Sequence, residues 1–304
     1  YGEGNLFEGL AISKNKEFCL KHQNQYPVIF VSFKSITCST YDESYSGIKE
    51  LLSKLYEEHV SLLEGNALSD SEKAKFERIR NKTTEDSAEI SYAIANLTLY
   101  IEKKYNQLPV LLLDEYDTPI HAAYMEGYYE DMIGLMRTIL GEALKDNDCL
   151  GKAIVTGMTR VAKESLFSGV NNLKVYTLLS EKYGQYFGFT EEEVSSLLPK
   201  DIAIEPIRDW YNGYQIGKYK VYNPWSIINY IDNNAILIPY WVNTSDNALV
   251  YKLIEDAKPS VKVRFEKLIE GEVERQELSD DLTFSYLEND ENAIWTLLVR
   301  TGYL

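Results

Sequence analysis

Short apolar runs recur in the first half of the chain, and each has the length of a buried strand. Residues 27–33 are rich in β-branched and aromatic side chains, residues 110–113 are entirely apolar, and residues 153–157 repeat the pattern. Such runs are typical of parallel strands, because helices cover both faces of a parallel sheet. Residues 173–178 have a similar composition and predict a fourth strand.

Between these runs, apolar residues recur every three or four positions, which predicts amphipathic helices. Such stripes occupy residues 48–56 and 90–100. Ser or Thr followed three residues later by Glu, at 40–43 and 69–72, matches the capping box that begins helices. Residues 118–144 open with Thr-Pro and predict one long helix. Strands that alternate with helices indicate an α/β fold with a parallel sheet.

The pattern changes near residue 184. Residues 190–193 again have capping-box spacing, and the rest of the chain is helix-rich and Tyr-rich, with Asn-Gly and Asn-Pro turns. We therefore expect two domains, an α/β core over 1–184 and a mainly helical domain over 185–304. A winged-helix-like fold is one option for the second domain.

The charge and residue composition argue against some binding partners, namely nucleic acid, membranes and metal ions held by cysteine. The net charge is −16, from 47 acidic and 31 basic side chains, and this excess repels nucleic-acid backbones unless basic residues are segregated on one face. The sequence contains no apolar run long enough to span a membrane and no N-terminal secretion signal, so we expect a cytoplasmic protein. The spacing of Cys19, Cys38 and Cys149 is not that of a metal site, so we expect them to be reduced thiols in the core.

Two acids, Asp114 and Glu115, follow the apolar run 110–113 directly. Open parallel sheets place ligand sites at the carboxyl ends of their strands. In a P-loop NTPase, Asp114 would hold the Mg²⁺ that bridges the nucleotide phosphates, and Glu115 would orient the attacking water. On the residues alone, an ordinary water-exposed strand end is an equally good interpretation. Asp117 fits a turn or a helix start better than a site.

Thr156 ends the next apolar run, and Arg160 follows it closely. In a P-loop core, such residues can sense the γ-phosphate and stabilise charge in the transition state. Taken alone, these residues fit a Thr-Gly turn with a solvated arginine better. The three histidines are scattered singly and predict ordinary surface or core roles.

The phosphate-binding loop that such a site needs is absent from the sequence. Its motif is Gly-x-x-x-x-Gly-Lys-Ser/Thr, whose backbone amides and lysine hold the phosphates. Gly151-Lys152 is followed by alanine and Gly217-Lys218 by tyrosine, and neither has the required upstream glycine. The strand that would feed the loop is also missing. Because the chain opens on Tyr1 in a glycine-punctuated stretch, we expect it to be a fragment.

Several further motifs occur in a recognisable order. They are residues 5–10 (NLFEGL), 111–119 (LLLDEYDTP), 156–160 (TGMTR), 187–194 (FGFTEEEV), 210–214 (WYNGY), 222–226 (YNPWS) and 240–245 (YWVNTS). With these motifs the chain resembles the bacterial AAA-ATPase-like proteins, which are P-loop ATPases often joined to a C-terminal PD-(D/E)XK nuclease-like domain.

The resemblance implies that Asp114 and Glu115 are the Walker B acids and that Thr156 and Arg160 face the nucleotide. Members carry an Arg-x-Arg-Arg-Phe-Gly-Lys-Thr-like loop upstream, and this sequence begins after that point and stops near the start of the nuclease-like region. The expected function is therefore that of a fragment of an ATPase that uses Mg²⁺ and ATP to drive conformational change, inactive without the upstream loop.

Two alternatives remain open. The ATPase core could be a degenerate scaffold within a regulatory module that binds protein or nucleic acid, although the acidic balance argues against nucleic acid. Asp114, Glu115 and Asp117 could instead form a metal nuclease centre. This second alternative is weaker, because the spacing identifies no further lysine or acid on a neighbouring strand.

Overall fold

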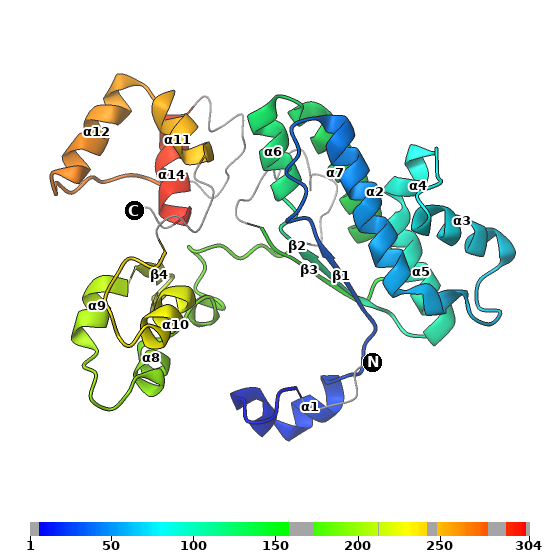
Figure 1. Ribbon diagram of the computed structural model, residues 1–304, viewed down its shortest axis with the longest axis horizontal. Helices are drawn as coiled ribbons and strands as arrows, with labels where there is room; N and C mark the ends of the chain where they lie inside the picture. Colours follow the sequence, from blue (N-terminus) through cyan, green and yellow to red (C-terminus); the bar gives the residue numbers. More distant parts are fainter. Residues whose placement is uncertain (1–5, 158–172, 212, 242–247, 279–289, 302–304) are drawn as a thin grey trace. The chain divides into compact units, whose positions relative to one another are not determined.

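The computed structural model describes residues 6–157, 173–211, 213–241, 248–278 and 290–301. The chain divides into two compact units, Tyr1–Asn172 and Leu173–Leu304, which are drawn in Figure 1. Each unit has hydrophobic residues of its own that are almost completely buried.

A three-stranded parallel sheet lies at the centre of unit 1. Its strands are β1 (Val28–Ser32), β2 (Val110–Asp114) and β3 (Lys152–Val155), and β2 is in the middle. The three strands coincide with the apolar runs of the sequence, so the expected α/β fold with a parallel sheet is confirmed. The fourth strand predicted for residues 173–178 is wrong, since these residues have no strand pairing and belong to unit 2.

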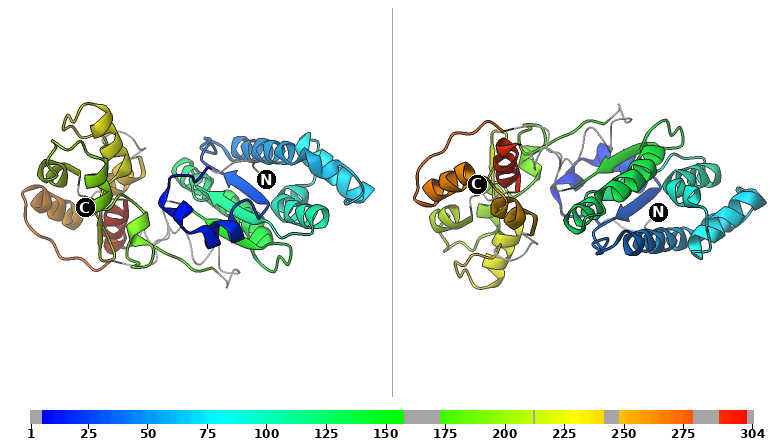
Figure 2. Two further views of the ribbon diagram at one scale, coloured as in Figure 1. Left: turned by 90° about the horizontal axis from the view of Figure 1, so that it is seen from below. Right: turned by 90° about the horizontal axis from the view of Figure 1, so that it is seen from above.

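Helices form most of the rest of unit 1 (Figure 2). The predicted N-caps are present: the Thr40 side chain accepts a hydrogen bond from the Glu43 N–H, and Ser69 and Glu72 form a complete capping box. The helical elements before the sheet centre are η1 (Ala11–Lys14), α1 (Lys16–His22), α2 (Tyr41–Glu58), η2 (Val60–Leu63), α3 (Asp70–Arg80), α4 (Ser87–Ser91) and α5 (Ala93–Tyr105).

The segment predicted as one long helix over residues 118–144 is two helices, α6 (Thr118–Glu126) and α7 (Tyr129–Leu144). Gly127 separates them with a left-handed backbone (φ +85°), and its N–H donates to the Ala123 carbonyl. Glycine adopts this conformation without a Cβ clash, so it ends α6 as a C-cap. The prediction of a single helix was wrong because it ignored this glycine.

The two faces of the sheet differ in exposure. Ile29, Val31, Leu111 and Leu113 point to one face and are at most 1% exposed. Helix α2 contacts β1 of the sheet and helix α5, and α5 in turn contacts α7. The side chains that alternate with the buried ones along the strands point to the opposite face, and two of them are exposed: Phe30 by 56% and Ile154 by 53%.

Unit 2 contains short helices and one β-hairpin. Thr190 and Glu193 form the capping box expected from the sequence. Strands β4 (Tyr214–Ile216) and β5 (Tyr219–Val221) pair antiparallel, and an isolated bridge joins Phe189 to Tyr222. The helical elements are η3 (Gly184–Tyr186), α8 (Glu191–Leu197), α9 (Glu205–Tyr211), α10 (Pro224–Asp232), α11 (Ala248–Glu255), α12 (Pro259–Ile269) and α14 (Glu291–Thr301).

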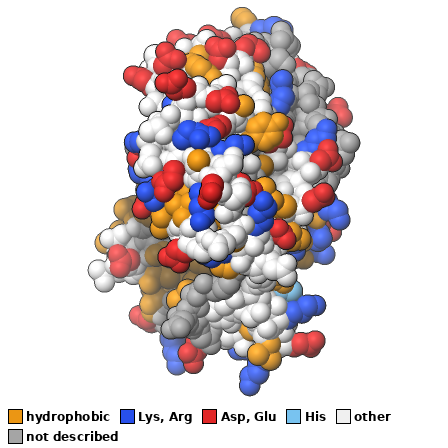
Figure 3. Space-filling model, turned by 90° about the vertical axis from the view of Figure 1, so that its right-hand side faces the viewer, with side chains coloured by type: hydrophobic (Ala, Val, Ile, Leu, Met, Phe, Trp, Pro, Cys, Tyr) orange, Lys and Arg blue, Asp and Glu red, His pale blue; other side chains and the backbone are white. Residues whose placement is uncertain are grey.

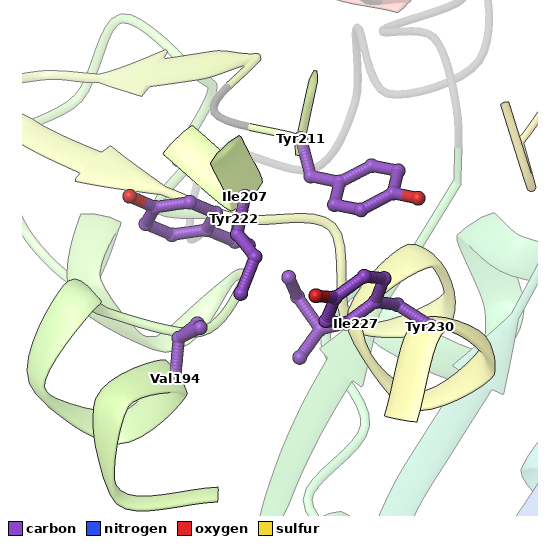
Figure 4. Close-up of a cluster of buried hydrophobic side chains, with 6 residues drawn as sticks. All are labelled: Val194, Ile207, Tyr211, Tyr222, Ile227 and Tyr230. Atoms are coloured by element: carbon purple, nitrogen blue, oxygen red, sulfur yellow. The ribbon is translucent and has the colours of Figure 1, made fainter. Parts of the chain in front are cut away.

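Aromatic residues build the core between α8, α9 and α10. Figure 4 shows the side chains that converge there: Val194, Ile207, Tyr211, Tyr222, Ile227 and Tyr230. The Tyr211 hydroxyl donates to the Ile238 carbonyl (2.8 Å) and the Tyr222 hydroxyl to Glu191 Oε2 (2.9 Å), so both rings are buried without losing their hydrogen bonds. The aromatic motifs around residues 210–214 and 222–226 therefore contribute to packing.

The surface charges, the lengths of the helices and the state of the cysteines can also be compared with the expectations from the sequence. On the face shown in Figure 3, basic and acidic side chains are intermixed. Helices of membrane-crossing length and apolarity do not occur among the described residues. Cys19, Cys38 and Cys149 are free thiols, but each is only partly buried, so the expectation that they lie in the core is wrong.

Candidate functional site

Three polar residues lie side by side at the carboxyl ends of the three strands. They are Ser32, Asp114 and Thr156, and we call them the strand-end row. Ser32 is in register with Asp114, and Thr156 comes directly after β3. They continue the face that carries Phe30 and Ile154, because side chains alternate between the faces along each strand. The Thr156 N–H donates to the Leu113 carbonyl at 2.8 Å, which extends the β2–β3 pairing to this row.

The Asp114 carboxylate accepts hydrogen bonds from both neighbouring strand ends. Ser32 Oγ donates to Asp114 Oδ2 at 3.0 Å, and Thr156 Oγ1 donates to Asp114 Oδ1 at 2.8 Å. These two bonds restrict the orientation of the carboxylate. Each carboxylate oxygen still has acceptor capacity for a cation or a water. Asp114 is thus a preoriented group on the open face of the sheet.

Glu115 leaves the strand in a strained conformation. Its φ of +52° lies in the left-handed region, which costs a non-glycine residue about 1–2 kcal/mol. Thr118 Oγ1 donates to Glu115 Oε2 at 3.3 Å. Burial, followed by the nearby charges of Asp117 and Asp114, raises the pKa of the Glu115 carboxyl, whereas the Thr118 hydrogen bond and Lys34 act in the opposite direction. A raised pKa makes this carboxylate a stronger proton acceptor.

Asp117 lies beneath the loop that follows β3. It is the N-cap residue of α6, and its carboxylate does not cap the helix by a side-chain hydrogen bond. The residue is 1% exposed, and His121 Nε2 lies 3.4 Å from Asp117 Oδ2. The sequence interpretation of Asp117 as a helix start agrees with this position. Its burial beside Glu115 could not be anticipated from the spacing.

Gly157 permits the close approach of the β3 exit to the Asp117 loop. A Cβ atom added at residue 157 would lie 2.5 Å from Asp117 Oδ1 and 2.7 Å from Tyr116 Cε1. The Tyr116 N–H donates to the Thr156 carbonyl at 3.2 Å and ties the two loops together. Any side chain at residue 157 would push the loops apart, so glycine there keeps Thr156 within reach of Asp114.

The structure thus brings Asp114, Glu115 and Thr156 to one sheet edge, as the strand-end pattern predicts. Arg160 lies outside the described residues. Ser32 was missed by the sequence interpretation, although it carries the same signal as Asp114 and Thr156: a polar residue near the end of an apolar run.

The oxygen donors of this row suit magnesium better than a softer metal. Mg²⁺ takes oxygen ligands and is usually held by one or two carboxylates together with waters and substrate phosphates. Asp114 with the hydroxyls of Ser32 and Thr156 matches that donor type. Within the described part of the chain, no three His, Cys, Asp or Glu side chains gather in a metal-binding group. Asp114, Glu115 and Asp117 are not such a group, so the described residues give no support to the nuclease-type centre considered above.

Comparison with known proteins gives a family match. A family model described as "Predicted AAA-ATPase" matches residues 1–167. The chain is also 29% identical over 201 residues to an "Uncharacterized protein in vnfD 5'region" of Azotobacter chroococcum mcd 1. That alignment covers 64% of this chain and 36% of the relative, so the chain spans about a third of the relative's length. No solved structure matches the chain.

Proposed function

The chain belongs to the family of predicted AAA-ATPases, and from this premise we propose that the row Ser32, Asp114 and Thr156, with Glu115 beside it, is the magnesium and water half of an ATP-hydrolysing site. The observation that carries the proposal is the Asp114 carboxylate, held by hydroxyls from both neighbouring strands and facing the open side of the sheet. Strand-end carboxylates of this kind hold Mg²⁺ against nucleotide phosphates in P-loop enzymes.

Each residue has a distinct role in this proposal. Asp114 would hold Mg²⁺, which when bound neutralises charge on the phosphates. The hydroxyls of Ser32 and Thr156 keep the carboxylate in its orientation and can donate to a phosphate oxygen or to a water. Glu115 accepts the proton of the attacking water, for which its raised pKa suits it. Arg160 is proposed to stabilise the developing charge, as the family resemblance implies.

The phosphate-binding loop is proposed to come from a segment of the parent protein outside residues 1–304. Two observations support this. The sequence contains no Gly-Lys-Ser/Thr loop, and Val28, Phe30 and Ile154 are about half exposed on the face that carries Asp114. Parallel sheets are normally covered on both faces, so a further layer is expected there. The 304-residue chain alone should then lack ATPase activity.

Other attributes of the parent protein are proposals on the same basis. We place it in the cytoplasm, with Mg²⁺ and ATP as cofactors and with ATP hydrolysis driving a conformational change. A C-terminal nuclease-like domain in the parent protein is proposed from the family resemblance.

A single substitution in the complete gene product tests the catalytic role. Glu115→Gln keeps the size of the side chain and removes the proton acceptor, so ATP turnover should fall by about 100-fold or more while ATP binding persists. Glu130→Gln, at an exposed position of α7, is the matched control and should keep full turnover. Undiminished hydrolysis by Glu115→Gln would refute the assignment. If the complete gene encodes no phosphate loop, a regulatory scaffold becomes the better interpretation.

A further inference from the structure

The helical layer of unit 1 contains a cavity that the strand-end site does not use. It has a volume of about 280 Å³ and is lined by residues of α2, α3, α4 and α5, and of the chain around them. Figure 1 shows where these four helices lie in unit 1. This volume is near the lower end of the range for small-molecule sites, roughly 300–1,000 Å³. The rings of Tyr56, Tyr92 and Tyr100 contribute to its walls. A ligand of amino-acid size would fit such a space.

Two polar side chains in the wall have unused hydrogen-bonding capacity. Tyr100 is 2% exposed, yet within the described part of the chain its hydroxyl makes no hydrogen bond. The Asn96 side-chain amide also has no hydrogen-bond partner among the described residues. By contrast, the hydroxyl of neighbouring Tyr56 donates to the Ala93 carbonyl at 2.7 Å. Among the described residues, the fully buried side-chain atoms without a hydrogen-bond partner are Arg80 Nε and Trp295 Nε1. The Tyr100 hydroxyl is not one of them, so its oxygen is accessible from the cavity and can donate to a ligand there.

The wall carries charged groups of both signs. The Lys75 ammonium makes no salt bridge among the described residues, but its charge, after larger effects of Arg78 and Thr84, helps to lower the pKa of the Glu89 carboxyl. Asp86 uses one carboxylate oxygen to cap α4, by accepting from the Ala88 N–H at 2.9 Å, and its other oxygen remains available. The third charged group, Glu89, is neutralised by a bidentate pair with Arg78. A ligand with several negative charges, such as a nucleotide, would meet two carboxylates and only one ammonium.

We propose that this cavity binds a small zwitterion of the free amino-acid class, with its carboxylate toward Lys75 and its ammonium toward Asp86. Tyr100 and Asn96 supply the hydrogen bonds that complete its recognition. Burial, with smaller contributions from Glu72 and Glu89, raises the pKa of Tyr100 to about 12, so its hydroxyl remains a donor at neutral pH. The site is separate from the strand-end row and does not depend on ATP hydrolysis.

Titration of the 304-residue chain with pools of free L-amino acids, followed by ligand-observed NMR and calorimetry, tests the proposal. At least one amino acid should bind saturably at millimolar concentrations or below. Lys75→Gln and Asp86→Asn should each weaken its binding roughly tenfold or more, because each removes a charged partner. Asparagine also caps helices, so Asp86→Asn leaves the start of α4 intact. Tyr100→Phe should weaken binding while the fold is retained.

Matched controls separate specific binding from surface attraction. Lys54→Gln removes a lysine of α2 that pairs with Glu50 and does not line the cavity, so it should leave the affinity unchanged. The carboxamide of the bound amino acid and its N-acetyl derivative each lose one charge, and both should bind more weakly. Absence of saturable binding, unchanged affinity in Lys75→Gln and Asp86→Asn, or equal affinity for the N-acetyl derivative would each overturn the proposal.

Discussion

Three acids within four residues have different environments, and these environments separate their roles. Asp114 is held between two hydroxyls on the open face, Glu115 is strained and has a raised pKa, and Asp117 is buried beneath Gly157. Their order in the sequence indicated a site. Their different roles depend on the backbone conformation of the residues that follow β2. This conformation cannot be deduced from the pattern of residues.

The packing of Gly157 predicts a stability effect. In Gly157→Ala, the added methyl group meets the Asp117 carboxylate and the Tyr116 ring, so the free energy of unfolding should fall by about 1–3 kcal/mol. Chemical denaturation of the 304-residue chain measures this change. Gly141→Ala in α7 is the control, because its Cβ has open space and alanine favours the helix. A Gly157→Ala chain as stable as the original would show that the two loops are not tightly packed.

The raised pKa of Glu115 predicts a pH dependence of stability. Between the unfolded pKa of a glutamate, about 4.3, and the higher pKa in the fold, the folded state binds more protons than the unfolded state. The contribution of Glu115 to stability should therefore fall as pH rises through this window and then level off. Unfolding free energies of the original chain and of Glu115→Gln, compared across pH, give this difference. A difference that does not change with pH would contradict the raised pKa.

At the scale of elements, hydrophobic periodicity and capping residues in the sequence predicted the positions of most strands and helices of unit 1. The three sheet strands and the caps at Thr40 and Ser69 follow from local sequence, because an apolar run of strand length and a capping residue each occupy only a few consecutive positions. The order of the strands, and so the meeting of Ser32 with Asp114, depends on contacts between distant segments. Residues 173–178 have a strand-like composition, but strand formation also needs a neighbouring strand to pair with.

The two complete capping boxes predict measurable contributions to stability. Ser69→Ala removes the acceptor for the Glu72 N–H and Thr190→Ala the acceptor for the Glu193 N–H, so each should cost about 0.5–2 kcal/mol. Ser71→Ala, an exposed change inside α3, should have little effect and serves as the control. Denaturation midpoints of the three variants check this. If the cap variants match the control, these caps contribute nothing measurable.

At the scale of the whole molecule, the chain consists of two units with separate cores. The domain boundaries expected from the sequence, 1–184 and 185–304, stay a prediction about independent folding. Calorimetry should resolve two unfolding transitions, with Ser69→Ala lowering one midpoint and Thr190→Ala the other, because each cap belongs to a different unit. A single transition that both variants shift equally would contradict independent units.

The central claim is that Asp114 holds the magnesium of an ATP site, and Mg²⁺-dependent ATP binding by the complete gene product tests it most directly. Calorimetric titration with ATP, with and without Mg²⁺, should show that Mg²⁺ strengthens binding to the unsubstituted protein. In Asp114→Asn this dependence should be lost, while Asp131→Asn, an exposed control on α7, should retain it. Unaltered Mg²⁺-dependent ATP binding by Asp114→Asn would contradict the account.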